Sequence, residues 1–365
     1  MIAAVFCLLV FPAALSPAAS GSDLTIIDAA RKTQTLRSLI HQLADKRAVF
    51  IGEDHDRYNN HLNQLQIIRE LNTNAPGRWV IGVEYIQRRF QPYLDAYFNK
   101  TISEPEFLHQ EEYFERWGFD WRLYRPIFRY ARDHHIPIVA LNAERELTDE
   151  VDRAGLAALP AADRARLPQH IEDADAAYRE RLRKIFDEHP DQGNFDRFVE
   201  AQLVWDETMA ESVAIYLAAH PDKSMIVLAG EGHMAFRSGI PDRVSRRLPG
   251  IRTAVLLPAD KPGDDLEGAD YLLVSPTLPL PPSGKMGVTL NTTTSEVSVK
   301  SVSANGAGAQ AGLQVGDRIV EIDGQPVHSL ADFRLALLDK KPGKHVRLRI
   351  QRGKEEMAIQ LTLKP

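Results

Sequence analysis

Three short segments begin with glycine and carry glutamate or histidine within the next three residues, in a pattern that suits metal or cofactor binding. They read GEDH at 52–55, GVEY at 82–85 and GEGH at 230–233. Carboxylates and imidazoles are common side-chain ligands of transition metals, and a bound metal lowers the pKa of its water ligand. The candidate ligands for Mn, Co or Zn are Glu53, His55, Glu84 and His233. The chain has no HExxH motif, which excludes the common zincin mechanism.

The same residues also have a purely structural interpretation. Asp54 or Asp56 would cap a helix that follows the first segment, and Glu84 would pair with Arg88 four residues later. Because the pattern repeats after three separate predicted strands, the functional interpretation is favoured.

The elements that must position these side chains are strands of a parallel sheet. Short, nearly continuous apolar runs are typical of strands covered on both faces. The runs occupy residues 48–51, 79–83, 136–141, 224–229, 253–257 and 271–274. Ligands bind at the carboxyl ends of such strands, which is where the three glycine segments lie. The sequence therefore predicts an α/β fold, with a parallel-rich sheet covered by helices.

Helices are expected between these strands. Leu62, Leu65, Ile68 and Leu71 recur at helical spacing and form one apolar face. A helix is expected over 126–134, with Pro126 in its first turn. Residues 148–220 contain no convincing strand and are predicted to form a helical insertion.

Four segments together resemble the ChaN-like haem-binding uptake family, which is related to the Tiki and TraB proteins. They read VFIGEDHD at 49–56, IGVEY at 81–85, YRPIFRYARDHHIPIVALNA at 124–143 and LAGEGH at 228–233. The resemblance covers about residues 35–260. It implies haem binding and a role in iron acquisition at the bacterial envelope. In Tiki-like relatives, the positions that match Glu53, His55, Glu84 and His233 support metal-dependent peptidase activity.

Haem requires an apolar slot, an axial His or Tyr, and basic side chains near its propionates. The region from Tyr85 to Tyr130 is dense in aromatic residues and arginines. Glu231 stands where family members commonly carry an amide, so it adds a carboxylate near the candidate site. The candidate haem-binding residues are His55, His61, Tyr85, Arg88, Tyr124, Arg125, Asn142 and His233.

The carboxyl-terminal segment carries a second motif. Residues 309–327 follow the pattern AxAGLxVGDxIxxIDGxxV, which is similar to bacterial PDZ domains, and the resemblance covers about 285–365. It implies that the carboxyl-terminal peptide of a partner adds as a strand to the domain. The candidate peptide-binding residues are Lys285, Met286, Gly287, Val288, Thr289, Leu290 and Leu330.

Composition and charge support a chain of two domains. The 365 residues are 44% hydrophobic and 26% charged, close to soluble globular averages, which excludes a disordered chain. The net charge of −6 gives no global field for nucleic acid, and one cysteine excludes a disulfide framework. From Lys285 onward the chain has 12 basic and 8 acidic residues, which gives a net charge of +4. The rest of the chain has a net charge of −10.

The predicted boundaries follow from these observations. Residues 1–20 carry no charged side chain and are expected to be a signal peptide that directs export to the periplasm or cell envelope. A ChaN-like domain is expected over 22–260, a proline-rich linker over 261–284 and a PDZ domain over 285–365. Peripheral association with a membrane stays open.

Three hypotheses about function remain at this point. The first is an exported envelope protein that binds haem or iron and recruits a protein partner through its PDZ domain. The second is a metal-dependent hydrolase or peptidase to which the PDZ domain presents substrates, with Glu53, Glu84 or Glu231 as general base. The third is an interaction scaffold whose α/β site has lost its activity.

Overall fold

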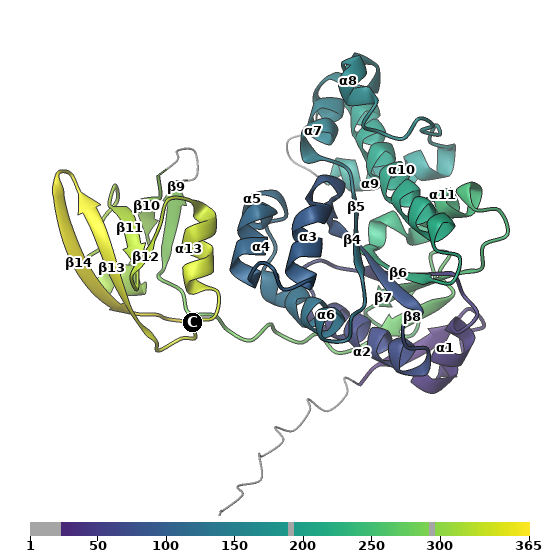
Figure 1. Ribbon diagram of the computed structural model, residues 1–365, viewed down its shortest axis with the longest axis horizontal. Coiled ribbons are helices and arrows are strands. Elements are labelled where there is room, and N and C mark those ends of the chain that lie inside the picture. The colour runs from purple at the N-terminus through teal and green to yellow at the C-terminus, as the bar shows by residue number, and fades with distance from the viewer. Residues whose placement is uncertain (1–22, 189–192, 292–295) are drawn as a thin grey trace, which may run out of the picture.

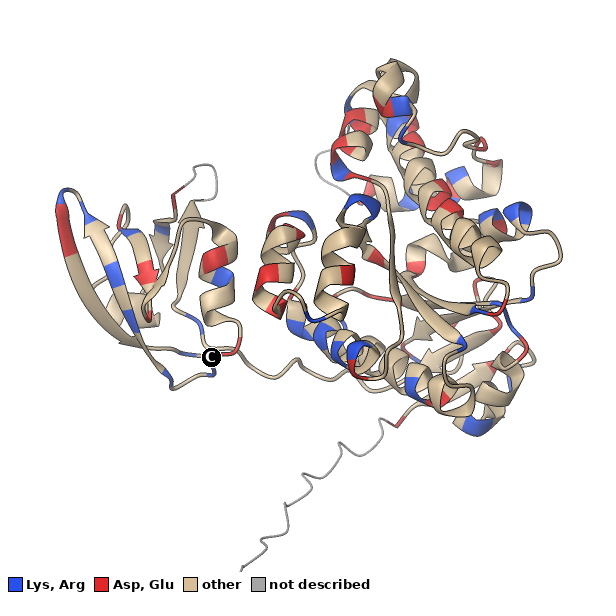
Figure 2. Cartoon of the chain, in the orientation of Figure 1, with Lys and Arg blue, Asp and Glu red and all other residues tan. Residues whose placement is uncertain are grey.

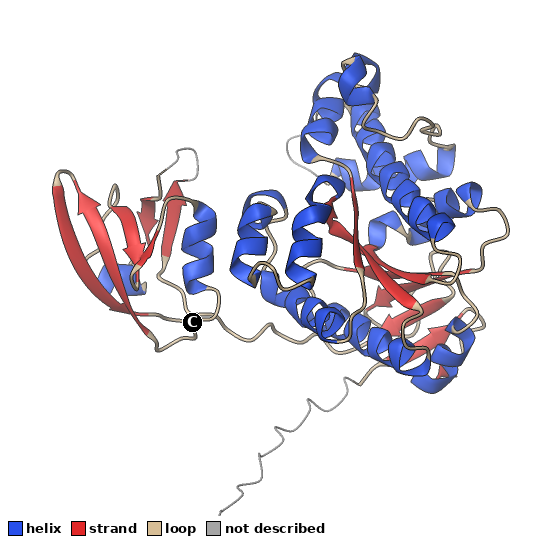
Figure 3. Ribbon diagram, in the orientation of Figure 1, coloured by secondary structure: helices blue, strands red, loops and turns tan. Residues whose placement is uncertain are grey.

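The computed structural model describes residues 23–188, 193–291 and 296–365, which form two units joined by an extended segment (Figures 1 and 3). The signal peptide expected at 1–20 lies outside these residues. In the part of the chain that is described, no helix combines the length and the apolar character needed to cross a membrane.

The larger unit is built on an eight-stranded sheet in the order β2-β1-β8-β7-β3-β6-β4-β5. Every neighbouring pair from β8 to β5 is parallel, whereas β1 is antiparallel to both β8 and β2. The predicted α/β class and all six predicted strands are therefore confirmed. The strands are β1 (Thr25–Asp28), β2 (Thr33–Gln34), β3 (Ala48–Glu53), β4 (Trp79–Gln87), β5 (Ile138–Asn142), β6 (Ser224–Gly230), β7 (Thr253–Ala259) and β8 (Tyr271–Val274).

Helices cover both faces of this sheet because its central strands are apolar on both sides. In β3, Val49 and Ile51 face one core cluster while Ala48 and Phe50 face the other. The first face is covered by α1 (Leu36–Leu43), α2 (Tyr58–Asn74), α3 (Gln91–Phe98), α4 (Glu104–Gln110), α5 (Tyr113–Arg116) and α6 (Trp121–Asp133). The second face is covered by α10 (Phe195–Ala219) and α11 (Ile240–Arg247).

The expected helical insertion lies between β5 and β6. It contains α7 (Arg145–Ala154), α8 (Ala161–Arg164), α9 (Ala176–Asp187) and α10. Helices α7, α9 and α10 pack around two small apolar clusters of their own. Short 3-10 turns complete the unit: η1 (Arg88–Phe90), η2 (Leu156–Ala158), η3 (Glu231–His233) and η4 (Ala235–Arg237).

Two local expectations were wrong. The helix expected over 126–134 already begins at Trp121, because the carboxylate of Asp120 caps it by accepting a hydrogen bond from the Arg122 backbone N–H. Pro126 therefore lies inside the helix and not in its first turn. The segment 261–284, expected to be a linker, contains the inner strand β8 between β1 and β7, so it includes part of the sheet as well as linker.

The smaller unit is an antiparallel sheet in the order β14-β13-β11-β10-β9, with β12 paired to β11. Buried Ile319, Ile322 and Leu348 lie in its core. Strand β9 is an edge strand, with α13 nearby. The elements are β9 (Val288–Asn291), β10 (Ser298–Val302), α12 (Ala307–Gln310), β11 (Arg318–Ile322), β12 (Gln325–Pro326), α13 (Leu330–Leu337), β13 (His345–Arg352) and β14 (Glu355–Thr362).

The two units are in contact through α13, which lies beside α4 and α5 (Figure 1). Leu335 and Leu338 pack against the core of the larger unit. Figure 2 shows basic residues along α6. Arg125 of this helix binds the carboxylate of Asp339, with 3.0 Å between Nη2 and Oδ2. The same guanidinium also binds Glu104, so Arg125 links the two units.

Candidate functional site

The three glycine segments meet because their strands are neighbours. The order β3-β6-β4 places the carboxyl ends of all three strands at one edge of the sheet. Glu53 ends β3, Glu84 lies in β4, and His233 follows β6 in the turn η3. The structure thus brings together the side chains proposed as one site, and parallel pairing is the physical reason.

His55 is held by one ring nitrogen while the other has no hydrogen-bond partner. Its Nδ1 donates to Oε1 of Glu53 at 3.0 Å, and Gln64 Nε2 donates to the other oxygen of Glu53 at 2.8 Å. Within the described residues, Nε2 of His55 makes no hydrogen bond. Burial lowers the pKa of His55, but the bond to Glu53 and the charge of Glu84 outweigh it, so the pKa lies above its ordinary value.

His233 is held by two carboxylates instead of one. Its Nδ1 donates to Oδ1 of Asp206 at 2.7 Å, and its Nε2 lies 3.4 Å from Oε1 of Glu84. Burial opposes the charged imidazolium, yet the charges of Glu84 and Asp206 raise the pKa of His233 to about 10. Burial also acts against the Glu84 carboxylate, and the charge of His233 lowers the pKa of Glu84 to about 2. The pair is a buried ion pair at neutral pH.

A cavity of about 450 Å³ opens beside the two histidines. Its apolar walls are the aromatic rings of Tyr85, Trp117, Phe119 and Trp205. The ring of His55 lies 4.8 Å from Trp117 and 5.0 Å from Phe119, centroid to centroid. Arg116 and Arg145 also line the cavity, but Arg116 is bound to Glu112 and Glu146.

Two of the other proposed haem-binding residues line this cavity. Tyr85 reaches it with a buried hydroxyl that has no hydrogen-bond partner among the described residues, and burial raises its pKa well above the ordinary value. Asn142 lines the cavity as well, with its amide oxygen accepting from the backbone N–H of Ala143 at 2.8 Å.

Four proposed residues do not line the cavity. His61 is buried behind His55, where its Nε2 donates to the His55 carbonyl at 3.1 Å. Tyr124 is also buried and donates to that carbonyl at 3.4 Å. Arg88 is bound to Glu211 at 2.9 Å, and Arg125 lies at the contact between the two units. His61 and Tyr124 support the site from behind, whereas the two arginines serve other contacts.

Glu231 was expected near the site and is not part of it. Its side chain lines a separate acidic hollow together with Asp54, Asp260 and Glu267. Burial, reinforced by the charges of those carboxylates, raises the pKa of Glu231 to about 7. The turn η3 directs His233 to the cavity and Glu231 to the hollow.

Sequence reasoning missed Asp206 and Trp205, which α10 contributes from the helical insertion. Asp206 is 1% exposed, and its Oδ2 accepts from the hydroxyl of Tyr178 at 2.7 Å. Acidic residues inside the apolar part of a long helix, as in LVWDETMA at 203–210, were the available signal.

The structure does not confirm the divalent-metal hypothesis. In the ranges described, no group of three or more His, Cys, Asp or Glu side chains is arranged to hold a metal ion. Glu53 binds Nδ1 of His55 and Asp206 binds Nδ1 of His233, so each of these two carboxylates orients an imidazole ring.

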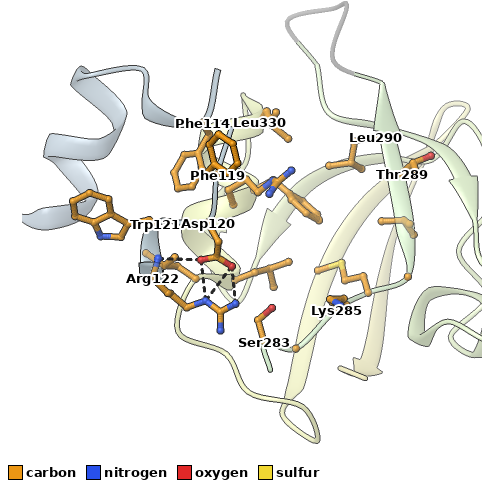
Figure 4. A pocket seen from close by; sticks show the side chains of 18 residues that line it. Phe114, Phe119, Asp120, Trp121, Arg122, Ser283, Lys285, Thr289, Leu290 and Leu330 are labelled. Carbon is orange, nitrogen blue, oxygen red and sulfur yellow. Dashed lines mark hydrogen bonds and ion pairs between the residues drawn. The ribbon is translucent and has the colours of Figure 1, made fainter. Parts of the chain in front are cut away.

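The second candidate site is a groove of about 520 Å³ beside the edge strand β9 (Figure 4). All seven residues proposed for peptide binding line it, opposite Phe114 and Phe119 of the larger unit. The turn at its end requires glycine at 287, where φ is +71° and an added Cβ would lie 2.7 Å from the Gly306 Cα. The structure therefore gathers the following residues along one groove: Lys285, Met286, Gly287, Val288, Thr289, Leu290 and Leu330.

Comparisons with known proteins agree with this architecture. The family model for haem-binding uptake proteins, Tiki superfamily, ChaN, matches residues 39–244, and the PDZ model matches 284–363. The solved structure of ChaN from Campylobacter jejuni has the same fold, with a TM-score of 0.57 and 20% identity over 69% of this chain and 97% of that one.

Curated relatives match a short part of the chain only. The regulator of sigma-E protease RseP of Salmonella typhimurium is 47% identical over 64 residues, and that of Escherichia coli is 40% identical over 63. The match spans 14% of the length of each relative. The first family model matches more than half of the chain. The chain therefore belongs to the ChaN-type haem-binding uptake family of the Tiki superfamily, and it carries a PDZ domain after that unit.

Proposed function

We propose that the larger unit binds haem in the cavity beside His55. The observation that supports this most strongly is the state of His55: Glu53 holds Nδ1, while Nε2 has no hydrogen-bond partner among the described residues. The aromatic walls fit an apolar macrocycle, and the related structure from Campylobacter jejuni is named for cofacial haem binding. When bound, haem would supply an iron that accepts a ligand from a protein side chain.

His55 would suit haem iron as a ligand better than Tyr85 would. Burial keeps the phenol of Tyr85 neutral, whereas a tyrosine ligand is bound through its oxygen as phenolate. Glu53 fixes His55 in the tautomer with its proton on Nδ1, which leaves the lone pair on Nε2. Arg145, whose side chain is 52% exposed, is the basic residue of the cavity best able to reach a propionate.

Titration with haemin tests this function. The parent protein should give a saturable Soret shift, and His55→Ala should weaken binding by at least about tenfold, the effect of losing about 1.4 kcal/mol. His134→Ala is the matched control, because His134 is exposed and lies at the end of α6, away from the cavity. Equal affinity in all three proteins would contradict His55 as ligand.

We propose that the PDZ domain binds the free carboxyl terminus of a partner. Three features support this: β9 is an edge strand, the groove lies beside it, and the groove carries Lys285 and Arg334, whose side chains have no ion-pair partner among the described residues. A labelled decapeptide with a free carboxylate should bind with saturation, and the amidated peptide should bind at least about tenfold more weakly, a difference of about 1.4 kcal/mol. Equal binding of both peptides would count against carboxylate recognition.

We further propose export to the cell envelope, where the protein would handle haem or iron. The support is the uncharged segment 1–20, with its apolar run and small residues before position 21. Amino-terminal sequencing of protein from the periplasmic fraction should begin near residue 21. Intact Met1 on protein found only in the cytoplasm would contradict this assignment.

A further inference from the structure

The peptide groove and the haem cavity share one wall. Phe119 lines both of them, and among the described residues it is the one that does so. Its ring lies 5.0 Å from the ring of His55 and 5.6 Å from that of Trp117. On the groove side, Phe119 stands beside Phe114 and faces β9 (Figure 4).

This wall is a short segment between two helices. Residues 117–120, here called the shared wall, connect α5 with α6. Gly118 adopts φ +80° and so reverses the chain between Trp117 and Phe119. The indole of Trp117 donates to the hydroxyl of Tyr124 at 2.9 Å, and that hydroxyl lies 3.4 Å from the His55 carbonyl. A restraint on Phe119 therefore also restrains His55.

A peptide in the groove must contact both units. Added to β9 as a further strand, it lies next to Leu330 of α13 on one side and meets Phe114 and Phe119 on the other. Contact between the peptide and Phe119 holds the shared wall against His55. The shared wall and His55 then lose less conformational freedom when a ligand binds in the cavity.

The charge of the groove indicates the class of peptide. The side chains of Lys285 and Arg334 have no ion-pair or hydrogen-bond partner in the described part of the chain. Asp120 is the acidic residue of the groove, and Arg122 binds it at 2.6 Å. The groove therefore favours an acidic carboxyl-terminal peptide that ends in an apolar residue.

We propose that such a peptide and the ligand of the His55 cavity bind with positive coupling through Phe119. The inference rests on the proposed haem and peptide binding and adds that the two are linked. Coupling is reciprocal, so each ligand should raise the affinity of the protein for the other by the same factor, about fivefold or more.

Calorimetry on the full chain tests the proposal with haemin as probe. Haemin is titrated with and without a saturating decapeptide that carries two glutamates and a terminal valine. The haemin dissociation constant should fall about fivefold with this peptide, and much less with the same concentration of its more weakly bound amidated form. The reverse titration, peptide into haemin-loaded protein, should give the same factor.

Two variants localise the coupling. Phe119→Ala should remove it, so that haemin binds equally well with and without peptide. Phe114→Ala is the matched control: Phe114 lines the groove and not the cavity, so this variant should weaken peptide binding and keep the coupling factor.

The outcomes separate the inference from the function beneath it. Coupling in the parent and in Phe114→Ala, but not in Phe119→Ala, supports the inference. Independent binding of both ligands overturns the inference and leaves the proposed function standing. Failure of the parent to bind haemin or peptide overturns both, and coupling that survives Phe119→Ala shows that the shared wall does not carry it.

Discussion

The cavity and the groove of this protein depend on different kinds of interaction. The cavity depends on buried charges: His233 lies between Glu84 and Asp206, and His55 is held by Glu53. The groove depends on backbone shape, an edge strand and a glycine turn at 287, with few charged contacts. We therefore expect the stability of the cavity to depend on single charged side chains and on pH. We expect the groove to depend on substitutions that change its shape.

The largest expected effect is the loss of Asp206. Asp206→Ala leaves Nδ1 of His233 and the hydroxyl of Tyr178 without their partner in a buried site, which should lower the free energy of unfolding by about 3–5 kcal/mol. Urea unfolding measures this loss. Asp196→Ala on the same helix removes an exposed ion pair with Arg179 and should cost about 0–1 kcal/mol. Similar losses in the two variants would contradict a charge-dependent cavity.

Stability should also depend on pH through His233. Its pKa is raised to about 10 in the folded protein and is about 6.5 when unfolded. This contribution to the free energy of unfolding is therefore complete below pH 6.5 and is lost as the pH rises towards 10. Thermal unfolding between pH 6 and 10 tests this, and His233→Gln should flatten the profile. A parent profile that is equally flat would show that the ion pair contributes nothing.

The contact between the units should respond to Arg125. Its side chain is 13% exposed and binds Glu104 and Asp339. Arg125→Ala should therefore lower the free energy of unfolding by about 1–2 kcal/mol and make the linker more accessible to protease. Arg129→Ala is the control, because Arg129 is half exposed and meets Glu104 from the same helix. Unchanged cleavage between residues 275 and 284 in Arg125→Ala would mean that the contact does not hold the units together.

The smallest effect should come from the groove. Leu330→Ala removes apolar surface beside the peptide and should weaken peptide binding about tenfold, or about 1.4 kcal/mol, without changing haemin binding. Val315→Ala alters an exposed side chain that does not line the groove and should change neither affinity. Equal peptide affinity in both variants would place the peptide elsewhere.

Much of the fold and part of the site could be predicted from the sequence. Strands β3, β4 and β6 are continuous apolar runs, and glycine marks the point where each polar segment leaves the sheet. That local signal was sufficient to predict that Glu53, His55, Glu84 and His233 lie at one edge of the sheet. The short strands β1 and β2 lacked such a signal, since β1 pairs with β8, more than 240 residues away, and β2 pairs with β1 at the edge of the sheet.

Contacts between distant segments could not be predicted in the same way. Asp206 lies 27 residues before His233, and only the packing of α10 on the sheet brings the two together. Arg125 looked suitable for a propionate because it lies in an aromatic, arginine-rich stretch. Its partner Asp339 is 214 residues away, and no local pattern encodes that pairing.

Imidazole rescue tests the central claim, that Nε2 of His55 is the haem ligand, most directly. His55→Gly should lose the Soret band of the haemin complex, and free imidazole should restore it, since the small ligand can occupy the space left by the side chain. The same imidazole should leave the parent spectrum unchanged. A His55→Gly protein that binds haemin with the parent spectrum before imidazole is added would contradict the claim.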